Sequence, residues 1–396
     1  MPYNPFPSRR TSPCSAAHHI PFTETNESGI MTSYPHQIGS LPRVGSAGGH
    51  GTVRRRGLLR LGMVAAVTAP FGLRPSPASA AAELGAPAIL QGRNKLTIIW
   101  TPSSLCNVVI GLAQRQGIYE KHGLDVTTLN VGSDTSAILE ALALGKADAT
   151  SNFLLRFLKP LEAGFDVKLT AGVHGGCSIL IGSRDAGIEK LQDLAGKRIG
   201  MSDLSSPMKL LYEIHLRKNG VPPDSITWRQ FPADVFPLAV QKKEIEAFAD
   251  GHPTAYYAIK RSNGRLFELA SNGTGELGQY TCCVLAVSGK LLRENRPAAV
   301  ALTRAMVEAS KMVDRNNSLA VDAAQHYSPR QVKPEEIGEM IASYPYDEVR
   351  GCPTGEAFRK HVLYFAQGLK ETGILKPSTD VVKFTNRITL DILSTS

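Results

Sequence analysis

The sequence predicts an α/β protein, because short apolar strands alternate with helices along most of the chain. The first observation is a β-branched, apolar run at residues 95–100, followed by a loop and a helical stretch that ends near Gly117. The second is that the same order recurs up to about residue 250. Strands that alternate with helices indicate βαβ units and a parallel sheet.

The individual elements follow from composition and periodicity. The predicted strands are residues 95–100, 125–131, 147–152, 167–173, 197–202, 226–231, 245–250 and 281–287. The predicted helices between them include residues 133–144, 154–163, 207–219 and 236–244. Gly117 and Gly145 suit the end of a helix, where glycine adopts the left-handed conformation. Beyond residue 287, amphipathic helices are predicted at 297–314, 333–343 and 356–372.

Length and charge restrict the class of protein. The chain has 396 residues, 42% of them hydrophobic, and a formal net charge of +9. This length allows two or three domains with a sizeable core and excludes disorder throughout. Residues 1–80 hold eight arginines and two acidic residues, a net charge of +6. Because the remainder carries only +3 and nowhere clusters basic with aromatic residues, we expect no nucleic-acid partner.

The basic front of the chain has the order of an export signal. Residues 54–60 (RRRGLLR) resemble the twin-arginine export motif, with Arg55 and Arg56 as the pair. The mainly apolar residues 61–73 are too few to span a bilayer, which needs about 20, but suit the core of a signal peptide. Residues 78–80 (ASA) then form a small-residue cleavage site.

We therefore predict a disordered leader and signal peptide at residues 1–80, cleaved near Ala80, and a linker at 81–94. The mature protein is expected to be periplasmic or otherwise extracytoplasmic, without a membrane span. A disordered basic tail is the alternative interpretation, and Met31 is an alternative start.

Three sequence phrases occur in order along the chain. They are residues 117–126 (GIYEKHGLDV), 141–149 (ALALGKADA) and 188–200 (IEKLQDLAGKRIG). Together they resemble the substrate-binding proteins of ABC importers for nitrate, sulfonate and taurine, a group that also includes thiamine-precursor binding proteins. The resemblance covers about residues 95–375.

The resemblance implies a two-lobed periplasmic-binding-protein fold of type II, with two crossover segments and a ligand cleft between the lobes. Lobe 1 would comprise residues 95–177 and 281–396, and lobe 2 residues 178–280. The crossovers would lie near residues 174–185 and 272–283. The function implied is that of a receptor that captures a small oxyanion or organosulfonate, of the nitrate, taurine or alkanesulfonate class. It would deliver this ligand to the membrane subunits of an ABC importer, as a monomer without a cofactor, a metal or catalytic residues.

Candidate ligand residues in lobe 1 are polar residues at strand ends, where ligands bind in open α/β sheets. Ser103 and Ser104 follow the first strand, Asn152 ends the third, and His174 and Gly175 end the fourth. Glycine allows close backbone approach, and a neutral imidazole can donate to an oxyanion. Helix capping by the serines and a hinge turn with a packed histidine remain the alternatives.

In lobe 2, Ser205 and Ser206 precede Pro207, which suits the first position of a helix. A helix start offers free N–H groups and partial positive charge, which favour an anion. Asp250 and His252 end another strand and are further candidates. If Asp203 and Asp250 both face the cleft ionised, they favour an amine-bearing ligand. If Asp203 points away, this objection to an anion weakens.

The predicted mature chain holds five cysteines. They are Cys106, Cys177, Cys282, Cys283 and Cys352. Because the resemblance places the two crossovers side by side, it implies a possible disulfide between Cys177 and either Cys282 or Cys283. Two alternatives stay open, a soft-metal site formed by His174 with these thiols, and simple buried thiols.

Other functions remain as alternatives. One is a binding protein for a pyrimidine or thiamine precursor or another amine-bearing molecule. Another is an enzyme like the fungal pyrimidine-precursor synthase, which shares the fold and uses a cysteine-rich iron motif. This chain has no run of three cysteines, and an enzyme is not expected. A ligand-sensing domain of a regulator would need an attached module, which residues 1–94 do not offer.

Overall fold

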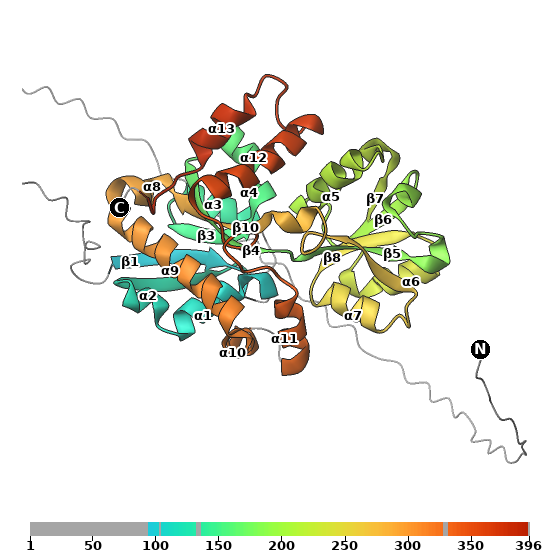
Figure 1. The fold of residues 1–396 in the computed structure, drawn as a ribbon, viewed down its shortest axis with the longest axis horizontal. Helices are drawn as coiled ribbons and strands as arrows, with labels where there is room; N and C mark the ends of the chain where they lie inside the picture. The colour runs from blue at the N-terminus through green and yellow to red at the C-terminus, as the bar shows by residue number, and fades with distance from the viewer. Residues whose placement is uncertain (1–93, 103, 132–135, 328–331, 395–396) are drawn as a thin grey trace, which may run out of the picture. The chain divides into compact units, whose positions relative to one another are not determined.

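The computed structural model describes residues 94–102, 104–131, 136–327, 332–394 and contains two five-stranded sheets flanked by helices (Figure 1). The predicted α/β class is confirmed. The leader, the arginine pair, the cleavage site, most of the linker and Ser103 lie outside the described residues. No helix in the described part of the chain is long and apolar enough to cross a membrane.

The first sheet has the strand order β2-β1-β3-β10-β4. Its strands are β1 (Asn94–Trp100), β2 (Leu124–Asn130), β3 (Ala149–Phe153), β4 (Val167–Gly175) and β10 (Thr281–Ser288). β2, β1 and β3 run parallel, whereas β10 lies antiparallel between β3 and β4. The chain therefore returns to this sheet only after it has built the second one.

The second sheet has the order β7-β6-β8-β5-β9. Its strands are β5 (Ser178–Ser183), β6 (Arg198–Met201), β7 (Thr227–Gln230), β8 (Ala247–Gly251) and β9 (Leu266–Ser271). β7, β6 and β8 are parallel, but β5 is antiparallel to both β8 and β9. The predicted parallel pairing is thus wrong for β10, and β5, whose residues were predicted to lie in a crossover, is an antiparallel strand. Only two residues join β4 of the first sheet to β5 of the second, so the chain passes directly from one sheet to the other.

Helices cover both faces of the two sheets. Those next to the first sheet in sequence are α1 (Val108–Arg115), α2 (Ile118–Lys121), α3 (Ser136–Ala143) and α4 (Leu154–Glu162). Those of the second sheet are α5 (Pro207–Lys218), α6 (Phe236–Gln241) and α7 (Thr254–Lys260). The carboxyl-terminal helices are α8 (Gly289–Glu294), α9 (Arg296–Arg315), α10 (Asn317–Tyr327), α11 (Pro334–Ala342), α12 (Gly355–Glu371) and α13 (Val381–Ile388). Of these, α9, α12 and α13 contact β4.

Three buried clusters form the core. One joins α1, α9, α10 and α11 to the first sheet, and another joins α6 and α7 to the second. The third is continuous across both sheets, because α5 packs against α4 and α12. At this contact a Cβ on Gly368 of α12 would lie 2.6 Å from Cγ2 of Ile214 on α5. The two sheets are therefore joined by packed side chains as well as by the chain itself.

Candidate functional site

The two segments that connect the sheets touch each other. Residues 176–177 join β4 to β5, and residues 272–280 join β9 to β10. The side-chain Oδ1 of Asn272 accepts hydrogen bonds from the backbone N–H groups of Cys177 and Ser178, both at 2.8 Å. Gly176 has a φ of +39°, and a Cβ there would lie 2.3 Å from Cα of Gly273. The crossovers are thus held together by a shared acceptor and a close backbone approach.

Four cysteines gather at this junction, and we call them the thiol cluster: Cys106, Cys177, Cys282 and Cys283. Cys106 lies in the 3₁₀ turn after β1, Cys177 lies in the first crossover, and the adjacent pair is on β10. The Sγ atoms of Cys177 and Cys282 are 3.3 Å apart, and all four are free thiols. The distance of 3.3 Å between Cys177 and Cys282 is longer than an S–S bond, which measures about 2.05 Å. A disulfide of Cys177 with Cys282 or Cys283 therefore stays a prediction.

His174 on β4 completes the cluster. One of its ring nitrogens lies within 4.8 Å of the Sγ atoms of Cys106, Cys177 and Cys283, which are likewise within 4.8 Å of one another. Its Nδ1 is 2.6 Å from the carbonyl oxygen of Gly175. Because a carbonyl only accepts, Nδ1 carries the proton and Nε2 is left with a lone pair. Nε2 is buried and has no hydrogen-bond partner among the described residues.

His252, which follows β8 in the second sheet, reaches the same region through Tyr344. The rings of His252 and His174 both stack on Tyr344, with centroids 5.6 and 5.7 Å away. The Nε2 of His252 lies 3.4 Å from the hydroxyl of Ser343. Burial lowers the pKa of His252 to about 4, so the ring is neutral at pH 7. Two predicted residues from different sheets thus meet on one tyrosine.

Tyr344 and its neighbour Tyr346 were not predicted as site residues. Both are buried, and Tyr346 lies 5.8 Å from His174, ring centroid to ring centroid. They belong to the segment between α11 and α12, where Gly175 donates its N–H to the carbonyl of Pro345 at 2.6 Å. A Tyr-Pro-Tyr sequence in a connection between amphipathic helices was the available signal.

Asn152 holds a cation that sequence reasoning also missed. Its Oδ1 accepts a hydrogen bond at 3.0 Å from Nε of Arg156, which lies in the first turn of α4. Burial lowers the pKa of Arg156, while its electrostatic interactions with Asp203 and Cys283 act in the opposite direction. A half-buried guanidinium therefore lies within electrostatic range of both the thiol cluster and the second sheet's loop. The signal was a lone arginine in an otherwise apolar helix start.

The remaining predicted residues lie around this centre. Ser104 Oγ is 2.9 Å from Cys106 Sγ and caps no helix through its side chain. Ser205 donates its hydroxyl to Asp203, which places Asp203 in a turn before α5. Ser206 is the N-cap of α5, accepting from Met208 N–H at 3.3 Å with Pro207 in the first turn, as predicted. The Oδ1 of Asp250 accepts from Gly251 N–H at 2.7 Å, and burial raises the pKa of this carboxyl.

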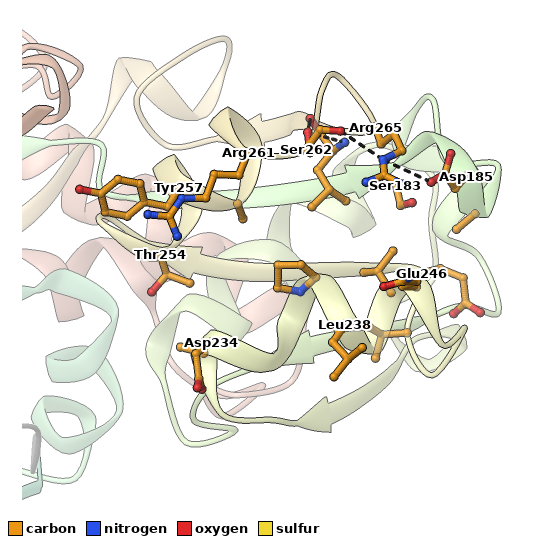
Figure 2. A pocket seen from close by; sticks show the side chains of 18 of the residues that line it. Ser183, Asp185, Asp234, Leu238, Glu246, Thr254, Tyr257, Arg261, Ser262 and Arg265 are labelled. Atoms are coloured by element: carbon orange, nitrogen blue, oxygen red, sulfur yellow. Dashed lines mark hydrogen bonds and ion pairs between the residues drawn. The ribbon is translucent and has the colours of Figure 1, made fainter. Parts of the chain in front are cut away.

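A separate pocket of about 1280 Å³ lies along the second sheet (Figure 2). Thr254 and Tyr257 of α7 line one end, and Ser183, Asp185 and Arg265 line the other. Leu105, the residue before Cys106, also lines it, but none of the described ligand candidates does. Its charged groups have mixed sign and its Arg265–Asp185 pair is solvent-exposed. We therefore place the candidate site at the crossovers, where buried polar groups of both sheets meet.

We predict that the stability of the protein depends on pH through His361, which contacts the chain where the second crossover enters β10. The backbone N–H of Thr281 donates to Nδ1 of His361 at 3.0 Å, and burial lowers the pKa of His361 from 6.5 to about 4. The unfolded chain therefore takes up this proton between pH 6.5 and 4 while the folded chain does not. The stabilisation is complete above pH 6.5 and lost as the pH falls to 4, a change of about 3 kcal/mol.

Urea unfolding of the full chain across this range measures the effect, and His361→Gln is expected to flatten the pH dependence. The pKa of His252 is also lowered to about 4 by burial, so part of the slope remains in the variant. An identical slope in the wild type and in His361→Gln contradicts the assignment.

Several solved structures share this fold. The alkanesulfonate-binding protein SsuA from Xanthomonas axonopodis pv. citri, bound to MOPS, is 18% identical, with a TM-score of 0.58 over 76% of this chain and 99% of that chain. The periplasmic aliphatic sulphonate binding protein SsuA from Escherichia coli is 16% identical, with a TM-score of 0.58 over 74% of this chain and 91% of that chain. The periplasmic nitrate-binding protein NrtA from Synechocystis PCC 6803 is 14% identical, with a TM-score of 0.59 over 76% of this chain and 88% of that chain. The fold is that of the periplasmic binding proteins.

The NMT1/THI5-like family profile matches residues 108–316, which is more than half of the chain, and the protein belongs to that family. No curated protein matches the sequence. The identities to the solved structures are low, so these structures establish the fold, and the ligand has to be argued from the site itself.

Proposed function

We propose that the protein is an extracytoplasmic solute receptor that captures a small oxyanion or organosulfonate and delivers it to an ABC importer. The observation that carries the proposal is the half-buried Arg156, oriented by Asn152 and within electrostatic range of Cys283 of the first sheet and of Asp203 in the loop before α5. The chain would be exported by its twin-arginine-type signal, cleaved near Ala80, and act as a monomer at the importer's membrane subunits. It would act without catalysis.

Arg156 is the group best suited to an anionic ligand. Its fork of N–H donors matches two oxygens of a sulfonate or nitrate, and burial strengthens such a contact. The hydrogen bond to Asn152 uses Nε, and within the described part of the chain the two terminal nitrogens of the guanidinium remain for a ligand. The start of α5, capped by Ser206, would add N–H groups from the second sheet.

Contacts between the two parts of the chain would stabilise a ligand-closed state. Tyr257 of α7 donates to Glu336 of α11 at 2.6 Å, and Lys260 pairs with the same carboxylate at 3.1 Å. A ligand held by residues of both lobes shifts the population towards the arrangement that contains these contacts. The lobe boundaries that we propose are residues 95–177 with 281–396, and residues 178–280.

A second candidate ligand is an amine-bearing ring, as in a pyrimidine or thiamine precursor. It is favoured by the stack of His252 on Tyr344, which suits a planar ring, and by the nearby buried carboxyl of Asp250. The two ligand classes differ in which side chain they need, Arg156 or Asp250.

Thermal-shift measurements on the full chain with nitrate, taurine, alkanesulfonates and pyrimidine precursors distinguish the two ligand classes. We expect an anion to stabilise the wild type, and Arg156→Ala to raise its Kd by about 30-fold or more, since truncating a buried charge partner costs about 2 kcal/mol or more.

Arg293→Ala, at an exposed arginine paired with Asp166, is the matched control and should bind like the wild type. Stabilisation by none of the anions, or an unchanged Kd in Arg156→Ala, contradicts the oxyanion proposal. Stabilisation by a pyrimidine precursor that is lost in Asp250→Asn supports the second candidate.

A further inference from the structure

The cluster at the crossovers holds the donor set of a metal site. We propose that Cys106, His174, Cys177 and Cys283 bind one thiophilic metal ion, of the Zn²⁺ class, in a closed tetrahedral site. This site is distinct from the oxyanion contact at Arg156, and either can fail without the other.

The spacing of the donors fits such an ion. The three Sγ atoms and one nitrogen of His174 all lie within 4.8 Å of one another. With Zn–S bonds of about 2.3 Å, sulfur atoms at two corners of a tetrahedron are about 3.8 Å apart. A contraction of about 1 Å or less therefore brings the set to bonding geometry. Three cysteines and one histidine are a common structural zinc set, and soft thiolates select zinc over magnesium or calcium.

The histidine is already in the tautomer that a metal requires. Nδ1–H donates to the carbonyl oxygen of Gly175, which fixes the lone pair on Nε2. This nitrogen is buried without a hydrogen-bond partner among the described residues, and because the ring is fully inaccessible to solvent, bulk water does not reach it either. A buried, unpaired acceptor is costly unless something binds it. A metal ion at the centre of the cluster supplies that partner.

The surroundings also suit the ion's charge and entry. A divalent ion with three thiolates and a neutral imidazole carries one net negative charge, and Arg156 interacts electrostatically with Cys283. Cys106 and Cys177 are only partly buried, which leaves a route for the ion, whereas His174 and Cys283 are buried. Each thiol that binds the ion releases its proton, so metal binding should also release protons.

Cys282 lies next to the site and outside it. Its Sγ is 3.3 Å from that of Cys177, but it is not in the group of four donors. A disulfide between these two residues would remove Cys177 from the ligand set. The metal-bound and disulfide forms therefore exclude each other, and the proposal concerns the reduced protein.

The test is a metal titration of the reduced, chelator-stripped full chain under anaerobic conditions, in a Cys14→Ser background that removes the leader thiol. Co²⁺ serves as the spectroscopic probe and Zn²⁺ as the competitor. We expect one equivalent of Co²⁺ to produce thiolate-to-cobalt charge-transfer bands and the intense d–d bands of a tetrahedral site. One equivalent of Zn²⁺ should remove both.

Cysteine variants decide which residues bind. Since loss of an outer-shell partner alone weakens metal binding by about 10–100-fold, Cys106→Ser and Cys283→Ser should raise the Zn²⁺ Kd by more than about 100-fold. Cys282→Ser, at the adjacent residue, and Cys352→Ser, at a buried thiol bonded to the carbonyl of Tyr346, should retain wild-type affinity and stoichiometry. Circular dichroism confirms that each variant is folded, and the partly exposed Cys106 tolerates substitution best.

Absence of stoichiometric binding in the reduced wild type overturns the proposal. So does equal affinity in Cys283→Ser and Cys282→Ser, because the geometry selects the first of these residues over its neighbour.

Discussion

Replacing Asn272 with leucine is expected to lower the free energy of unfolding by about 4 kcal/mol. Its Oδ1 accepts from the backbone N–H groups of Cys177 and Ser178, each at 2.8 Å. Leucine has a similar size but no acceptor, so two donors in a buried crossover lose their partner at a cost of about 1–3 kcal/mol each. Urea unfolding of the reduced full chain at pH 7 measures the change.

Asn272→Asp is the matched control, because it keeps an acceptor oxygen at the same place. We expect it to recover most of the loss at pH 7, where two N–H donors stabilise the carboxylate. Equal destabilisation by leucine and aspartate would show that the shared acceptor is not what holds the crossovers together.

Replacing Gly176 with valine is expected to destabilise the protein by a similar amount, about 4 kcal/mol. The φ of +39° is strained for a β-branched residue, and the added Cβ would lie 2.3 Å from Cα and 2.7 Å from N of Gly273. Because these are backbone atoms, they can make room only if the two crossovers separate. Thermal and urea unfolding report the loss, and Gly176→Ala provides a milder variant.

Gly187→Val separates the two causes. Gly187 has a φ of +71°, but among the described residues a Cβ added there would meet no heavy atom within 4 Å apart from those of its own chain neighbours, so valine meets backbone strain alone. We expect it to cost about 1 kcal/mol. If Gly176→Val is no worse than Gly187→Val, the crossovers do not depend on their close approach.

Local patterns predicted most of the helices and strands. The strands now labelled β1, β2, β3 and β4 were found to within two residues, because each is a short apolar run between turn signals. The cap of α5 followed from Ser206 and Pro207 alone. By contrast, β5 was taken as part of a crossover, since nothing local separates a connecting segment from a strand. Whether a strand pairs parallel or antiparallel depends on distant partners, which explains the error for β10.

The candidate site was only partly predictable for the same reason. His174 and Asn152 could be found because they end strands, and the adjacent cysteines on β10 because they fall near a crossover. Arg156 and Tyr344 were missed, because what brings Arg156 close to Cys283 and Asp203, and Tyr344 close to His174 and His252, is contact between residues far apart in the sequence. Cys106 was counted as a thiol, but its position beside Cys177 and Cys283 exists only in the folded chain.

The position of β10 between β3 and β4 sets an order of events during synthesis. Thr281 and His174, which hydrogen-bond across this pairing, are 107 residues apart, so β3 lacks a partner on one side and β4 lacks its neighbouring strand until β10 has been made. The second sheet, by contrast, is built from the continuous segment 178–271. We therefore expect the second sheet to form first on the ribosome. A chain released before residue 288 would expose β3 and β4 as aggregation-prone edges.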